Sequence, residues 1–151
     1  MEIERKFLIS APPSDLDRYA SRRIEQGYIS TDPTIRIRRQ DETYILTVKG
    51  KGRLAHEEFE LPLTAESYAR LMTKVEGRMI VKTRHLIPIE NDLTIELDHF
   101  ESPVKGLWLA EVEFPDIKTA EEFTPPAWLI KDVTDDPAYY NSAMSRLPEQ
   151  S

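Results

Sequence analysis

The chain has 151 residues, of which 27 are acidic and 20 are lysine or arginine, giving a formal net charge of −7 at pH 7. This length fits one domain with a substantial core, and we expect a single domain over residues 1–151. The absence of cysteine excludes disulfides and thiolate metal sites. The acidic balance argues against a nucleic-acid partner, because general nucleic-acid binding requires a basic surface.

No apolar run is long enough to span a bilayer, and the first residues lack the basic and apolar regions of a secretory signal. We therefore expect a soluble, cytoplasmic protein without a membrane partner. An acidic chain can still hold a local basic cavity that binds a compact anion. The sequence leaves the quaternary state open, with a homodimer among the options.

The first predicted element is a β-strand over residues 2–9. Its charged residues Glu2, Glu4 and Lys6 lie two positions apart, so in a strand all three side chains point to one face. A single stripe of this kind is usual on a solvent-exposed face. Its recurrence on later segments is what indicates a function.

Apolar periodicity and turn residues predict the remaining elements. Strands are predicted over residues 27–30, 34–40, 43–49, 56–63, 79–87, 93–98 and 107–114. Helices are predicted over residues 14–24, over 64–76 with Thr64 as N-cap and Gly77 as stop, from Thr119 to before Pro125, and from Asp136-Pro137 onward. Hairpin connections join many of the strands, so the predicted sheet is largely antiparallel.

One face of these predicted strands is almost entirely ionic, while the opposite face is mostly Ile, Leu, Val and Phe. The ionic residues, mostly in doublets of one sign, are Glu2, Glu4, Lys6, Arg36, Arg38, Lys49, Glu58, Glu60, Lys82, Arg84, Glu96, Asp98, Glu111 and Glu113. An ordinary half-buried sheet also has one polar face, but would mix in neutral polar residues. We therefore predict an α+β protein with a largely antiparallel barrel of about eight strands. Its charged lumen forms a tunnel, and its helices pack outside.

The charges of such a lumen also predict what fills it. Like charges crowded inside a barrel are tolerated only when counterions neutralise them. Carboxylate doublets without cysteine or clustered histidine suit hard cations such as Mg²⁺ or Mn²⁺. Guanidinium and ammonium groups suit phosphate oxygens. Together these residues predict a site for a divalent metal and a polyphosphate.

The same residues resemble those of the CYTH superfamily, the triphosphate tunnel metalloenzymes. The N-terminal hallmark of that family, Glu-x-Glu-x-Lys, is matched by Glu2-Ile3-Glu4-Arg5-Lys6, and the later doublets follow in order along nearly the whole chain. The chain looks most like the short bacterial branch, whose members resemble inorganic triphosphatases. In that branch Asp-Asp-Pro-x-Tyr, here residues 135–139, precedes a closing helix.

The resemblance implies a role for each charged residue. It implies that the main divalent ion is held by Glu2, Glu4 and Glu113. It implies that a second ion or a water is held by Asp98 and Glu111. The implied phosphate clamp comprises Lys6, Arg36, Arg38, Lys49, Lys82 and Arg84. Residues that either join the metal set or orient the basic side chains are Glu58, Glu60 and Glu96. The residues placed nearest the chemistry are Glu111, Glu113, Lys6 and Arg38.

The implied activity is metal-dependent hydrolysis of inorganic tripolyphosphate, with nucleoside triphosphates as further candidate substrates. No covalent residue is needed, because phosphoryl transfer relies on positioning and charge neutralisation. One alternative is an adenylate cyclase of class IV, which needs an adenine pocket. Another is a non-catalytic polyphosphate-binding module, although binding an anion does not require the carboxylates. Tyr28 either closes one tunnel end or is an ordinary core residue.

Overall fold

The computed structural model describes residues 2–50 and 55–147. The strands in this part are β1 (Glu2–Ile9), β2 (Ala20–Thr31), β3 (Thr34–Gln40), β4 (Thr43–Lys49), β5 (Ala55–His56), β6 (Glu58–Leu63), β7 (Glu76–Pro88), β8 (Thr94–Ser102), β9 (Trp108–Glu113) and β10 (Leu129–Asp132). The helices are short: α1 (Ala65–Met72), α2 (Ile117–Glu122), α3 (Asn141–Met144) and the 3₁₀ helices η1 (Leu16–Arg18) and η2 (Pro137–Tyr139). None of these described helices has the length and apolar character needed to cross a bilayer.

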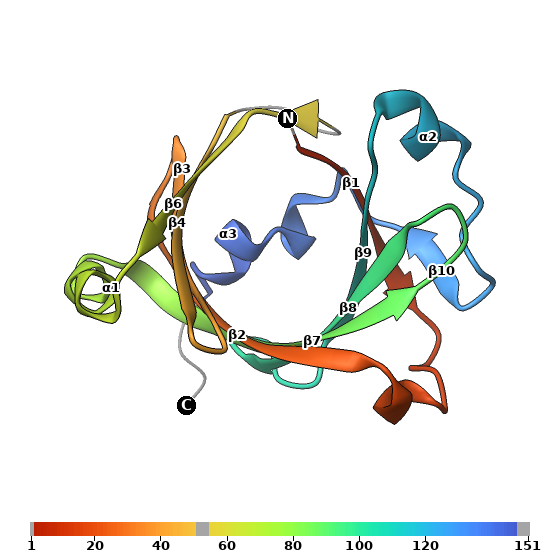
Figure 1. The fold of residues 1–151 in the computed structure, drawn as a ribbon, viewed down its shortest axis with the longest axis horizontal. Coiled ribbons are helices and arrows are strands. Elements are labelled where there is room, and N and C mark those ends of the chain that lie inside the picture. Colours follow the sequence, from red (N-terminus) through yellow and green to blue (C-terminus); the bar gives the residue numbers. More distant parts are fainter. Residues whose placement is uncertain (1, 51–54, 148–151) are drawn as a thin grey trace.

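The strands form one antiparallel sheet that curls into a ring (Figure 1). Their order is β10-β1-β9-β8-β7-β2-β3-β4-β6. A single residue separates β5 from β6. β5 pairs with β1 through Glu2↔His56 and Ile3↔Ala55, so the β6 end of the sheet is joined to β1 near the opposite end. With β5 and β6 taken as one interrupted strand, eight strands surround the lumen and β10 extends from the edge of β1. The predicted eight-stranded, largely antiparallel barrel is confirmed.

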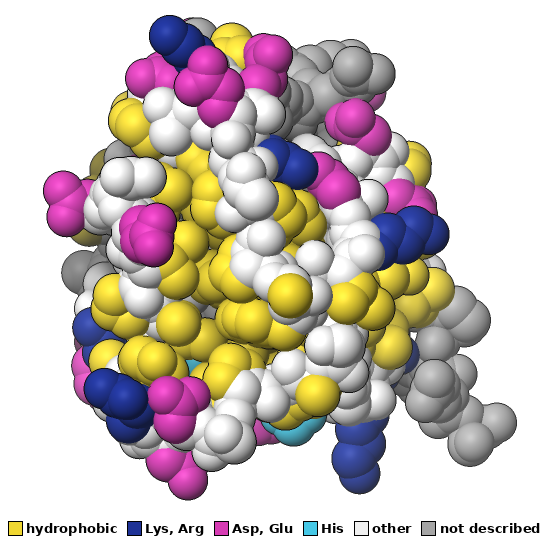
Figure 2. All heavy atoms as spheres, turned by 90° about the vertical axis from the view of Figure 1, so that its right-hand side faces the viewer, with side chains coloured by type: hydrophobic (Ala, Val, Ile, Leu, Met, Phe, Trp, Pro, Cys, Tyr) yellow, Lys and Arg dark blue, Asp and Glu magenta, His cyan; other side chains and the backbone are white. Residues whose placement is uncertain are grey.

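The outer faces of β1, β7, β8 and β9 carry the main apolar core. Its buried side chains are Ile3, Phe7, Ile87, Leu93, Ile95, Leu97, Ala110, Val112, Phe114, Ala120 and Leu129. Arg5 fastens α2 and β10 over this core, because its guanidinium donates to the Ala120 carbonyl at 2.9 Å and to Asp132 at 2.8 Å. Seen from this side, apolar side chains gather in the centre of the face, with charged ones around them (Figure 2). The apolar outer face leaves the inner face free to carry charge.

The last helix departs from the predicted external position. α1 and α2 lie outside the ring, whereas α3 projects within it when the barrel is viewed down its lumen (Figure 1). Met144 of α3 belongs to a buried cluster with Tyr28, Ile80, Phe100 and Leu109. The strands of Ile80, Phe100 and Leu109, which are β7, β8 and β9, also carry predicted charged residues. One end of the lumen is therefore apolar and is filled by η2 and α3.

The predicted helix over residues 14–24 is wrong. Only Leu16–Arg18 form a single 3₁₀ turn, and β2 begins at Ala20. β2 is an internal strand that pairs with β3 on one edge and β7 on the other, so two neighbours satisfy its backbone. Leu16 and Tyr19, which suggested a helical stripe, pack on the outer core instead. Tertiary pairing here overrides local periodicity.

The second predicted helix is confirmed at its start but not at its end. Thr64 caps α1 by accepting a hydrogen bond from the Ser67 backbone nitrogen at 3.0 Å. The helix ends at Met72, and Gly77 lies within β7 with φ of +73°. A Cβ at Gly77 would collide with the Ser145 carbonyl oxygen. Glycine at this position therefore lets β7 pass close to the end of α3.

The C-terminal third differs from the prediction in detail. β10 lies between the two predicted C-terminal helices, where no strand was predicted. α2 begins before Thr119 and is capped by Asp116, whose carboxylate accepts a hydrogen bond from the Thr119 nitrogen at 2.6 Å. Asp136 caps the last helical segment as predicted, accepting from the Ala138 nitrogen at 3.0 Å. That segment breaks at Tyr140, between η2 and α3.

Candidate active site

Strand register aligns the charged residues of β1, β9, β8 and β7 around one half of the barrel. The directly opposed pairs are Glu4–Glu113, Lys6–Glu111, Glu96–Glu111 and Arg84–Asp98. Opposed residues of an antiparallel pair point to the same face of the sheet. The doublets that are far apart in the sequence therefore share the inner face.

The other half of the barrel mixes charged and neutral residues. The directly opposed pairs there are Gln26–Arg38, Arg36–Thr47, Thr47–Glu60 and Lys49–Glu58. The neutral side chains Gln26 and Thr47 are fully buried, with 0% exposure. The inner face is therefore less uniformly ionic than predicted, and its neutral members contact Arg36 and Arg38 of β3.

A cavity of about 190 Å³ lies where these faces meet, and we call it the charged chamber. It is lined by Glu2, Glu4, Arg36, Arg38, Gln40, Lys49, Glu58, Glu60, Arg84, Glu96, Glu111, Glu113 and Asn141. The structure thus brings together all the predicted site residues except Lys6, Lys82 and Asp98. Its small volume matches a compact anion with its counterions.

Lys82 and Asp98 lie on the inner face of β7 and β8 but do not line the chamber, and each has 0% exposure. The Lys82 Nζ is 2.7 Å from one Asp98 oxygen. Arg84 donates to both Asp98 oxygens, from Nε at 2.8 Å and from Nη2 at 2.9 Å. Both oxygens of the Asp98 carboxylate are thus already bonded to cationic side chains. This geometry suits a residue that orients Arg84 better than it suits the predicted metal ligand.

Four basic side chains of the site are paired with carboxylates. The pairs are Lys49 with Glu2 at 2.9 Å, Lys6 with Glu111 at 3.5 Å, Lys82 with Asp98 at 2.7 Å, and Arg84 with Asp98 at 2.8 Å and Glu96 at 2.9 Å. Arg36 and Arg38 differ: within residues 2–50 and 55–147, neither has a carboxylate at ion-pair distance. These two guanidinium groups are therefore the positive charges most available to an anion.

Negative charge is crowded on the opposite side of the chamber. Burial and the neighbouring Glu111 and Glu2 raise the pKa of Glu4 to about 7. Burial and hydrogen bonding to Glu2 raise the pKa of Glu58 to about 8. Burial and Glu2 also raise the pKa of Glu113. Such shifts arise where carboxylates share a site with too little positive charge, so this side favours a bound cation.

Burial and neighbouring charges also shift the pKa values of the basic residues. Burial lowers the pKa of Lys6, but Glu111 and Glu4 outweigh it and the net pKa is raised. Lys6 therefore stays protonated at neutral pH. Burial, followed by Arg36 and Arg84, lowers the pKa of Arg38 to about 9. Because the charges that affect Arg38 most are those of two cations, Arg38 gains from a bound anion.

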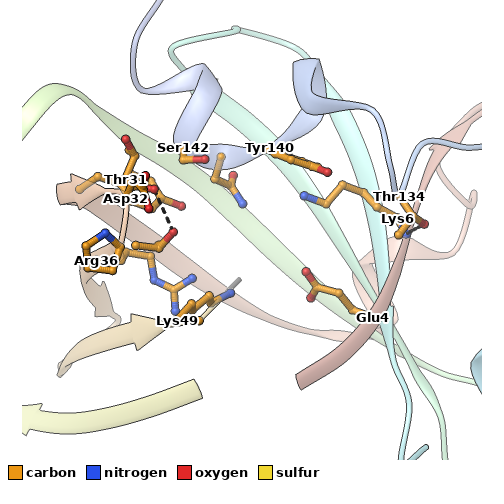
Figure 3. A pocket seen from close by; sticks show the side chains of 14 residues that line it. Glu4, Lys6, Thr31, Asp32, Arg36, Lys49, Thr134, Tyr140 and Ser142 are labelled. Atoms are coloured by element: carbon orange, nitrogen blue, oxygen red, sulfur yellow. Dashed lines mark hydrogen bonds between the residues drawn. The ribbon is translucent and has the colours of Figure 1, made fainter. Parts of the chain in front are cut away.

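A second cavity of about 460 Å³ adjoins the charged chamber on the side of α3. Figure 3 shows Glu4 and Lys6 on β1 facing Arg36 and Lys49 across it, with Tyr140 of the C-terminal segment above. The Lys6 Nζ donates to the Tyr139 carbonyl oxygen at 3.1 Å, which ties β1 to this segment. Tyr28 lines this cavity and also packs in the apolar cluster at the closed end.

Sequence reasoning missed several residues of the site. Gln26 and Thr47 occupy positions that face the lumen, and their strand alternation is the signal that could have found them. Asn141, which lines both cavities and accepts from the Lys82 Nζ at 3.5 Å, carries no such signal. Its place depends on how α3 folds back into the barrel.

These features define a class: small antiparallel barrels whose ionic interior is suited to polyanions and cations. The chain belongs to the CYTH family, since the model of the CYTH domain matches residues 1–140. The resemblance inferred from the sequence is confirmed.

Two relatives share this family and nearly the full length of the chain. The chain is 36% identical over 149 residues to the inorganic triphosphatase of Nitrosomonas europaea, covering 95% of this chain and 96% of that protein. It is 35% identical over 157 residues to the inorganic triphosphatase of Acetivibrio thermocellus, covering 97% and 94%.

Solved structures agree with the sequence relatives. The crystal structure of the inorganic triphosphatase NE1496 is 32% identical, with a TM-score of 0.72 over 99% of this chain and 97% of that one. The PH1819 protein of Pyrococcus horikoshii OT3 is 20% identical, with a TM-score of 0.55 over 81% and 83% of the two chains. At that identity the second likeness shows the fold alone.

Proposed function

We propose that this chain is a divalent-metal-dependent hydrolase of inorganic tripolyphosphate, with residues 1–151 acting as one tunnel domain. The observation that carries the proposal is the chamber itself. Within the described residues the guanidinium groups of Arg36 and Arg38 have no carboxylate partner, and they share a chamber of about 190 Å³ with carboxylates whose pKa values are raised. The names of the two sequence relatives support the same substrate class.

The carboxylates fit a hard divalent ion such as Mg²⁺ or Mn²⁺. Glu2, Glu4 and Glu113 would hold it, with Glu111 beside them. In the described part of the chain, no three acidic or histidine side chains are already gathered around one point. The raised pKa values of Glu4 and Glu113 nevertheless mark oxygen donors that lack positive charge. When bound, a divalent ion neutralises phosphate charge and makes a nearby water more acidic.

Residues of the chain itself position the phosphates and the attacking water. Arg36, Arg38 and Lys49 bind phosphate oxygens, and Lys6 neutralises charge that develops on the leaving group. Burial opposes ionisation of Glu111, but Lys6 and Arg84 outweigh it and hold its pKa well below the usual range. Glu111 is therefore ionised at neutral pH and can orient a water for in-line attack.

Other buried residues support this arrangement indirectly. Asp98, which is itself paired with Lys82, holds Arg84 from outside the chamber lining, and Glu96 holds it from within the chamber. Glu58 and Glu60 line the chamber next to the strand that carries Lys49. We assign these two carboxylates to orienting the basic side chains, with metal binding as the alternative role.

The adjoining cavity favours a second candidate substrate class, the nucleoside triphosphates. It shares Glu4, Arg36, Lys49 and Asn141 with the charged chamber, and its 460 Å³ leave room beyond a triphosphate. The same room is what an adenylate cyclase would need for adenine. Cyclic AMP formation from ATP distinguishes the cyclase from a hydrolase, which releases phosphate.

The test is phosphate release from tripolyphosphate and from ATP, with Mg²⁺, with Mn²⁺ and with EDTA. We expect turnover of tripolyphosphate that requires a metal and is lost in Glu113→Gln. Glu90→Gln, an exposed change outside the chamber, is the matched control and should keep full activity. Tight binding of tripolyphosphate without turnover under either metal would instead support a non-catalytic binding module. A cytoplasmic location, a homodimer and the lack of a nucleic-acid partner stay predictions.

A further inference from the structure

Arg36 and Arg38, the two inward-facing arginines of β3, are each held by a neutral side chain of a neighbouring strand. Gln26 on β2 lies opposite Arg38 and accepts a hydrogen bond from its Nε at 2.8 Å. Thr47 on β4 lies opposite Arg36 and accepts from its Nη2 at 3.2 Å. Both acceptors have 0% exposure. The two strands that flank β3 thus each supply one buried, uncharged acceptor.

Arg84, which lines the same chamber, is held in a different way. Its guanidinium bonds both oxygens of Asp98 and one oxygen of Glu96, at 2.8 to 2.9 Å. Carboxylates at this distance offset the positive charge and weaken its attraction for another anion. Among the described residues, the charge of Arg84 is therefore offset by protein carboxylates, whereas the charges of Arg36 and Arg38 are not.

Neutral acceptors at these two positions leave some buried hydrogen-bond donors without a partner. Among the described residues, Gln26 Nε2 and Arg36 Nε are buried nitrogens without a hydrogen-bond partner. Buried donors without partners are destabilising. A carboxylate at position 26 would remove the unpartnered amide and would pair with Arg38. Reversing the Gln26 amide does not help, because its NH₂ group would then face the Arg38 Nε–H.

We propose that Gln26 and Thr47 are positioning residues that fix Arg38 and Arg36 through neutral acceptors, leaving both positive charges available to a bound polyphosphate. This inference rests on the proposed function, since it names the residues that prepare its anion site. Neither residue touches the substrate. Each holds one nitrogen of its arginine, so that the remaining guanidinium nitrogens are free to bond phosphate oxygens.

The decisive variant is Gln26→Glu, which keeps the size and the acceptor but adds a carboxylate beside Arg38. Asn91→Asp, in the exposed turn between β7 and β8, makes the same amide-to-acid change outside the chamber and serves as the matched control. Binding of tripolyphosphate in EDTA is measured by calorimetry on the full chain, with thermal unfolding as the check on folding. We expect Gln26→Glu to bind at least about tenfold more weakly at an unchanged or higher Tm. Asn91→Asp should bind as the wild type does.

Substitutions at Thr47 provide a second, independent test of the proposal. Thr47→Val keeps the shape but removes the acceptor, whereas Thr47→Ser keeps the hydroxyl. We expect the valine variant to raise KM for tripolyphosphate under Mg²⁺ severalfold, and the serine variant to restore it. The inference is overturned if Gln26→Glu binds as tightly as the wild type, or if Thr47→Ser is impaired as much as Thr47→Val. A wild-type protein that neither binds nor hydrolyses tripolyphosphate would overturn the proposed function instead.

Discussion

Replacing Glu4 with glutamine should stabilise the metal-free protein, and only at higher pH. The folded-state pKa of Glu4 is raised from 4.5 to about 7. A group whose pKa is raised by folding favours the folded state while it is protonated, and this contribution is lost as pH rises through the folded-state value. The full shift corresponds to about 3 kcal/mol at most. Because the side chain keeps some solvent contact, we expect about 1–2 kcal/mol.

Urea denaturation in EDTA at pH 5 and pH 8 measures this difference. The Glu4→Gln variant should lie close to the wild type at pH 5, where Glu4 of the folded protein is still protonated, and should exceed its free energy of unfolding by clearly more at pH 8. Added Mg²⁺ should stabilise the wild type more than the variant, because the variant has lost a metal ligand. Glu90→Gln, with an exposed side chain, controls for net charge and should show neither effect. Equal free energies of unfolding for Glu4→Gln and wild type at pH 8 would refute the reasoning.

Three further changes test the chamber and the closed end. Arg38→Ala should raise KM for tripolyphosphate by about tenfold or more in a phosphate-release assay, since it removes a charged phosphate contact. An unchanged KM would contradict this role. Met144→Ala should lower the free energy of unfolding in urea by about 2–4 kcal/mol, because it leaves a cavity in a buried cluster. Gly77→Ala should lower the Tm measured by circular dichroism, since φ is +73° and Ser145 blocks the new methyl group. Unchanged stability of either variant would argue against the described packing of α3.

The inner face of the barrel could be predicted because a strand has a fixed period of two. Once Glu2, Glu4 and Lys6 are placed on one face, the other doublets follow by the same rule. Strand alternation does not predict how far along the lumen each inward-facing side chain lies. Ile80 lies on the same strand as Lys82 and Arg84, two residues before Lys82, yet it packs in the apolar cluster at the closed end.

The neighbours of each charge could not be predicted either. Asp98 is identical in chemistry to a metal ligand, and only the folded structure shows that Lys82 and Arg84 already occupy it. The first part of β2 was missed because its apolar spacing also fits a helix, whereas residues 27–30 were predicted as strand, and the two partner strands of β2 decide the outcome. Contacts of this kind depend on register between distant segments, which the local sequence does not encode.

The position of β1 in the ring has a consequence for how the protein folds. β2, β3 and β4 follow one another in sequence and pair as neighbours, so their hairpins can form locally. β1 lies at the N-terminal end of the described residues, yet it pairs along most of its length with β9 and β10, in the C-terminal third, and only through Glu2 and Ile3 with β5. Such long-range pairing is entropically costly and tends to form late. Glu2, Glu4 and Lys6 would thus reach the chamber only as the ring closes, which makes enzymatic activity a reporter of the last step of folding.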